Sequence, residues 1–202
     1  MTRSGFLRLI AVASSLLAVP AFAAPSQQAA ARFIQQTGNE LAAQLSAPGT
    51  IESKRPGFVA LMNRSVAMDE VARFCLGRYW RTAAPEQQQR YLQLFRTALT
   101  NAVIIRLANY QGGGVGITVT RAEPAADGVH VFTQITKPGS APYNVTWVVD
   151  GTEGQPQVVD VVAEGVSLRQ TQRSDYGSFL EQHGGNVEAL NQALRAQAAR
   201  GG

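Results

Sequence analysis

The strongest constraint on the fold is a change in the spacing of apolar residues at Gly112-Gly113-Gly114. Before this triplet, apolar side chains recur every three or four residues, which is the period of an amphipathic helix. After it they alternate along the chain, as in a half-buried strand, and the helical period returns near residue 169. We therefore expect helices both before and after a single group of strands along the chain. The expected helices are residues 27–45, a short helix after Pro56, a helix that Asp69 could cap and that stops at Gly77, residues 85–109, residues 169–183, and a short last helix capped by Asn186.

Four segments with alternating apolar and polar residues predict the strands, at 116–120, 129–136, 143–149 and 158–163. The turns between them are short, as at Asp150-Gly151, so neighbouring strands should be antiparallel. The alternation selects one apolar face, made of Ile117, Val119, Val129, Val131, Ile135, Tyr143, Val145, Trp147, Val149, Val159, Val161 and Ala163. That face must be covered, and the helices are the available cover. We predict one α+β domain in which helices cover one face of an antiparallel sheet of about four strands. The spacing leaves open whether helices and sheet pack solidly or enclose a cavity.

The first 23 residues have the pattern of a secretory signal peptide. Arg3 and Arg8 provide the positive start, and residues 9–19 form an apolar run that is too short to cross a bilayer. Ala21-Phe22-Ala23 places small residues before a cleavage site at Ala24. We expect a mature domain of residues 24–202 that has no second membrane-spanning stretch and works outside the cytoplasm.

Charge and cysteine content exclude several classes of function. The whole chain has a formal net charge of +4, and two of its basic residues lie in the signal peptide. The remaining bias is too weak to indicate nucleic acid as a partner. Cys75 is the only cysteine, so an internal disulfide is impossible and stability must come from the core.

Polar residues that could share a catalytic site are scarce. The candidates are His130, His183, Cys75, Asp160, Glu164 and Asp175. His130 is expected at the solvent-facing side of its strand, His183 at a helix C-terminus, and Cys75 as an inert thiol between Phe74 and Leu76. Asp160 falls on an outward-facing position of its strand. No spacing of these residues resembles a metal site, so we predict neither an enzyme nor a bound metal or cofactor.

Two motifs resemble a known protein family. The segment Leu76-Gly77-Arg78-Tyr79-Trp80, followed by Ala83-Ala84-Pro85-Glu86-Gln87 and a helix through Phe95, is similar to one conserved segment of the MlaC or toluene-tolerance family. Residues 159–168, with sequence VDVVAEGVSL, and the later Arg173-Ser174-Asp175-Tyr176 are similar to a second one. The order and spacing agree, and the resemblance extends over most of residues 24–202.

The resemblance implies a periplasmic carrier of Gram-negative bacteria that binds phospholipid. Such a carrier passes lipid between an outer-membrane lipoprotein complex and an inner-membrane ABC transporter complex. The implied fold is a twisted antiparallel sheet with helices against it and an apolar cavity for the acyl chains. The implied protein is a monomer and needs no cofactor. The residues expected to line the cavity are Phe74, Leu76, Tyr79, Trp80, Phe95, Leu99, Val103, Val131, Val145, Trp147, Val161 and Val166. Of these, Val131, Val145, Trp147 and Val161 are expected to face Phe95, Leu99 and Val103.

The sequence also departs from the family pattern at two places. Gln155-Pro156-Gln157 stands where relatives carry a Trp–basic pair, and Asn101-Ala102-Val103 where many carry an aromatic residue. These departures leave room for a hopanoid-associated branch of the family with a hopanoid-type lipid as ligand. A structural or adaptor subunit with a solid core is the alternative from a different class.

The signal-peptide interpretation predicts where the exported protein begins. We expect the intact mass of protein from the periplasmic fraction to correspond to a chain starting at Ala24, or within about two residues of it. Full-length protein recovered from the cytoplasm of the native host would contradict this prediction.

Overall fold

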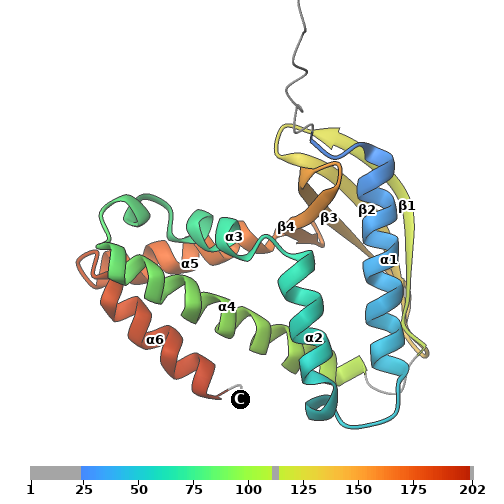
Figure 1. Cartoon of the computed structure of the whole chain (residues 1–202), viewed down its shortest axis with the longest axis horizontal. Coiled ribbons are helices and arrows are strands. Elements are labelled where there is room, and N and C mark those ends of the chain that lie inside the picture. The colour runs from blue at the N-terminus through green and yellow to red at the C-terminus, as the bar shows by residue number, and fades with distance from the viewer. Residues whose placement is uncertain (1–23, 111–113, 201–202) are drawn as a thin grey trace, which may run out of the picture.

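The computed structural model describes residues 24–110 and 114–200 (Figure 1). The predicted signal peptide and the first two glycines of the Gly112–Gly114 triplet lie outside these residues. Helices and strands follow the predicted order. The elements are α1 (Gln27–Ser46), α2 (Ile51–Ser65), α3 (Met68–Leu76), the 3-10 helix η1 (Gly77–Arg81), α4 (Pro85–Leu107), the 3-10 helix η2 (Ala108–Tyr110), β1 (Gly116–Ala125), β2 (Gly128–Thr136), β3 (Tyr143–Thr152), β4 (Gln155–Ala163), β5 (Val166–Ser167), α5 (Leu168–Gln182) and α6 (Val187–Arg200).

Side-chain caps set several of the helix starts. The Ser26 hydroxyl accepts a hydrogen bond from the Ala29 amide and begins α1. The Thr50 hydroxyl accepts one from Ser53, so α2 begins before Pro56 and contains it, where the sequence predicted a helix only after the proline. Asp69 was also expected as a cap but lies inside α3, which has no side-chain cap. The start of α3 is held instead by the Ala67 amide, which donates to the Val158 carbonyl of β4.

The five strands form one sheet in the order β1-β2-β3-β4-β5, and every pair of neighbours is antiparallel. This confirms the predicted α+β class and the meander, with the short β5 added to the expected strands. Register shifts occur in β1 between Val119 and Arg121 and in β3 between Val148 and Val149. The second shift moves Val158 to the inner face with Val161, where strict alternation predicted Val159.

Helix α1 covers the apolar face of the sheet (Figure 1). Ala30 and Ile34 are buried against Val129, Val131 and Val149. The helix approaches β1 closely because residue 38 is glycine: a Cβ there would lie 3.0 Å from the Cβ of Ile117. The expectation that residues 85–109 would provide this cover is therefore wrong. Helix α1 takes this position because Gln35 hydrogen-bonds to the backbone of β1 at Ile117 and Val119.

A second core lies beside the sheet and is built by α3, α4, α5 and α6 (Figure 1). Tyr91 of α4 is fully buried there, and its hydroxyl donates to the Ala72 carbonyl at 2.8 Å. Phe95 and Tyr176 pack edge to face with ring centroids 6.3 Å apart. The apolar residues thus form a helical core, a sheet core, and a smaller cluster of Leu45, Phe58 and Ile104 that joins α1, α2 and α4. Val66 contacts the helical core and the sheet core, and it forms a parallel bridge with Val158 of β4.

Asp160 fixes the helical core to the sheet. It faces outward on β4, as the alternation predicts, but the start of α5 covers it and it is only 7 % exposed. One carboxylate oxygen accepts hydrogen bonds from the Val161 and Arg169 amides, and the other accepts one from the Ser167 hydroxyl. The Arg169 guanidinium lies 3.5 Å away. Asp160 of the second sequence motif therefore has a structural role.

The Asp160 network predicts a stability effect. Asp160→Ala should lower the free energy of unfolding by about 3 kcal/mol, because it removes the acceptor of the Val161 and Arg169 amides and of the Ser167 hydroxyl. Asp175→Ala, at an exposed position of α5, is the control and should change it by less than about 0.5 kcal/mol. Urea denaturation of both variants measures the difference, and equal midpoints would contradict the assigned role.

Candidate functional site

A cavity of about 550 Å³ opens between α1, the C-terminal end of α2 and the turn from β3 to β4. Its volume falls in the range of about 300–1,000 Å³ that is typical of small-molecule sites. The lining residues are Phe33, Gln36, Thr37, Glu40, Arg64, Ser65, Gly154, Gln155, Pro156 and Gln157. A smaller hollow of about 230 Å³ lies on the opposite side of the sheet, where the Arg121 guanidinium stacks over the Phe132 ring.

The apolar side chains of the cavity lining are Phe33 and Pro156, and Phe33 connects the cavity to the sheet core. Phe33 is half-buried and packs with Val66, Trp147 and Val161. Trp147 is fixed in place because its indole N–H donates to the Thr133 hydroxyl at 2.9 Å. That hydroxyl in turn donates to the Val145 carbonyl, so the buried polar atoms are paired. A ligand that enters past Phe33 therefore meets an ordered apolar surface.

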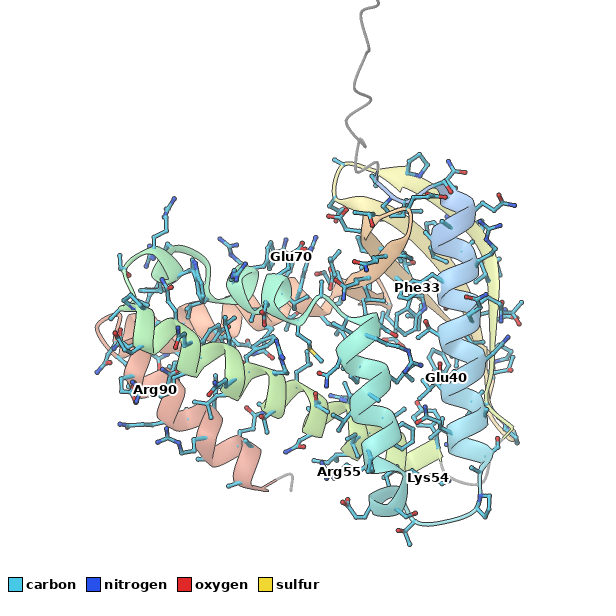
Figure 2. The ribbon with its side chains drawn as sticks, viewed as in Figure 1. Phe33, Glu40, Lys54, Arg55, Glu70 and Arg90 are labelled. Atoms are coloured by element: carbon cyan, nitrogen blue, oxygen red, sulfur yellow. The ribbon has the colours of Figure 1, made fainter. Side chains whose placement is uncertain are left out.

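The mouth of the cavity is polar. Figure 2 shows Phe33 and Glu40 on the side of α1 that faces α2. Residues 33, 37 and 40 share this side because they are spaced at helical intervals. The Glu40 carboxylate forms an ion pair with the Arg64 guanidinium of α2. The Gln157 side chain donates to the Arg64 carbonyl at 3.5 Å and connects α2 to β4.

The sheet residues predicted to line a lipid cavity come together. Val131, Trp147 and Val161 lie in the cluster that Phe33 joins, and Val145 lies in an adjoining cluster that shares Trp147 and Val161. Their separation from α4 is a correction to the sequence interpretation. Phe95 and Leu99 pack in the helical core and do not face these four residues.

The remaining predicted residues lie in the helical half or at the surface. Phe74, Leu76, Tyr79 and Trp80 belong to the helical core with Phe95 and Leu99. Val103 of α4 is half-buried. Val166 is 53 % exposed in β5.

Sequence reasoning missed the cavity residues of α1 and α2. The available signal was the amphipathic pattern of residues 27–45, in which Phe33 and Thr37 fall four residues apart. Because the helix of residues 85–109 is the one predicted to cover the sheet, the pattern of residues 27–45 predicts only a helix with one buried face. Arg64 and Glu40 gave no local signal, since single charges on helices usually face solvent.

The titratable candidates occupy structural positions. Burial raises the pKa of the Cys75 thiol to about 12, so the nucleophilic thiolate is scarce at neutral pH. The His183 ring N–H donates to the Phe179 carbonyl at 2.7 Å, and the His183 ring stacks on the Phe179 ring. His130 is half-buried and pairs with Asp127 at 2.8 Å. Within residues 24–110 and 114–200, no three His, Cys, Asp or Glu side chains gather as metal ligands would.

Of the helices in the described ranges, none combines the length and the hydropathy needed to cross a membrane.

Comparisons with known proteins agree on one family. The chain is 26 % identical over 204 residues to the toluene tolerance protein ttg2D of Pseudomonas putida, covering 98 % of this chain and 91 % of that protein. Its fold matches a phospholipid-binding protein from Ralstonia solanacearum, solved in complex with a phospholipid, with a TM-score of 0.72 and 21 % identity. That match covers 85 % of this chain and 98 % of the other. The model of the MlaC protein family matches residues 32–196, which is most of the chain, and the protein therefore belongs to the MlaC family.

Proposed function

We propose that this protein is a periplasmic carrier that binds the acyl chains of a phospholipid in the cavity between α1, α2 and β4. The observation that carries the proposal is the cavity itself, with Phe33 and the sheet core at its apolar end and a polar mouth. The phospholipid in the structure of the Ralstonia solanacearum protein supports it, since the two folds match. The finer role, shuttling lipid between an outer-membrane lipoprotein complex and an inner-membrane ABC transporter complex, follows the family resemblance.

The physical requirement for such a carrier is cover for the lipid tails. Exposing two acyl chains of roughly 16 carbons to water costs on the order of 25 kcal/mol, at about 0.8 kcal/mol per methylene. The head group needs no such cover. In this proposal the tails extend from Phe33 along Val131, Val145, Trp147 and Val161, between the sheet core and the helical core. The two cores are joined at Val66, by the Asp160 hydrogen bonds and through the cluster of Leu45, Phe58 and Ile104, so in this proposal the chains enter past Phe33 while these junctions stay in place.

Native mass spectrometry of the gently purified mature protein tests the carrier proposal. A co-purified lipid, identified after release, would support it and would distinguish a phospholipid from a hopanoid-type lipid. An empty protein that also takes up no lipid from vesicles would favour the structural or adaptor role.

A cavity-filling substitution predicts the location of the lipid. Thr37→Trp should reduce lipid occupancy severalfold, because the indole would occupy space at the cavity wall. The melting temperature of the delipidated variant should change little, since an open cavity accepts the ring without the roughly 1–3 kcal/mol cost of overpacking.

Ala43→Trp is the matched control, because residue 43 lies on the same helix at an exposed position. It should leave both lipid occupancy and melting temperature unchanged. Unchanged lipid content in Thr37→Trp, with a lower melting temperature, would remove this cavity as the binding site.

A further inference from the structure

The cavity mouth carries one cation and one anion. Among the residues that line the cavity, only Arg64 and Glu40 bear a formal charge. They come from different helices and pair with each other across the opening. Their side chains are 51 % and 45 % exposed, so each remains accessible to a ligand that arrives from solvent.

This ion pair is easily exchanged. Exposed pairs contribute about 0–1 kcal/mol because water screens them and both long side chains lose freedom. A guanidinium has five N–H donors in a planar fork, which fits the oxygens of a phosphate as well as those of a carboxylate. Glu40 also accepts from the Gln44 side chain at 3.4 Å, so the carboxylate keeps a partner when Arg64 leaves it.

The ion pair lines the same cavity as the apolar side chain of Phe33. Arg64 lies next to Ser65 and Val66, and Val66 packs with Phe33 in the sheet core. A ligand with its tails beside Phe33 would thus place its polar end among Arg64, Glu40 and the glutamines of the rim. An anionic group there would compete with the Glu40 carboxylate for the Arg64 guanidinium, which a neutral group cannot do.

We propose that Arg64 binds the phosphate of the lipid head group and that Glu40 takes the place of this phosphate in the empty protein. The inference rests on the proposed function and specifies its ligand class: phosphate-bearing lipids bind more tightly than uncharged lipids with the same chains. Glu40 competes with the phosphate and helps to release it.

The test uses delipidated mature protein and two soluble probes, dioctanoyl phosphatidylglycerol and dioctanoylglycerol, with affinities measured by isothermal titration calorimetry. Arg64→Gln should weaken binding of the phosphatidylglycerol about tenfold or more, the loss of one charge-assisted interaction, and leave dioctanoylglycerol unchanged. Arg64→Lys should recover part of the loss.

Glu40→Gln should strengthen binding of the phosphatidylglycerol a few-fold. Inorganic phosphate at millimolar concentration should not displace the lipid, which separates a head-group site from a free-phosphate site.

Arg121 and Glu123 provide a matched control, because they form an exposed ion pair at 3.3 Å on β1 and do not line this cavity. Arg121→Gln and Glu123→Gln should change neither affinity. Thermal melting confirms that each variant is folded.

Wild-type protein that binds neither probe would refute the carrier function itself. Binding of both probes by the wild type, with Arg64→Gln altering neither or altering both equally, would overturn the assignment of Arg64 and leave the carrier function standing.

Discussion

Strand β4 makes hydrogen bonds to four different parts of the chain. It pairs with β3 along most of its length, and its last residues pair with β5. Its Val158 carbonyl accepts from the Ala67 amide between α2 and α3, and its Asp160 carboxylate holds the start of α5. Because these connections lie within nine residues, β4 sets the position of the helical core relative to the sheet. The cavity lies beside this strand, so its shape depends on the same contacts.

The division into two cores follows from how the helices are attached. Helix α1 is held to the edge strand by Gln35, whose side-chain amide donates to the Ile117 carbonyl and accepts from the Val119 amide. This pairing satisfies edge groups of β1 and keeps α1 over the sheet. The helical core instead has its own aromatic centre around Tyr91, Phe95 and Tyr176. The two cores are also linked to each other, by the Asp160 hydrogen bonds and through the cluster of Leu45, Phe58 and Ile104, which joins α1, α2 and α4.

The sequence was sufficient for the class and order of the elements because these depend on local spacing. Pro85, for example, begins α4 as predicted, and the alternation around Val131 and Val145 places both in the core.

The choice of covering helix could not be predicted in this way. The helical patterns at Ile34 and at Phe95 both carry apolar residues that need cover, and only the path of the chain decides which one meets the sheet. The same limit applies to the cavity: Phe33 appears as a core residue in the sequence, and the charge pair of Glu40 and Arg64 joins residues that are 24 positions apart. The register shift at Val148 is likewise invisible to a strict alternation.

The energetics of a lipid carrier give the charge pair at the mouth more influence than its small strength suggests. The cost of exposing acyl chains to water is large, but a carrier exchanges lipid between a membrane and its own cavity, and both are apolar. The large terms therefore nearly cancel, since the methylenes are covered at the start and at the end of the transfer. What remains is the difference between smaller terms at the head group, where a charge-assisted hydrogen bond contributes about 1.5–3 kcal/mol. A guanidinium at the opening can therefore decide which lipids are retained. A carboxylate that competes for it keeps the preference modest, so that the cargo can still be released.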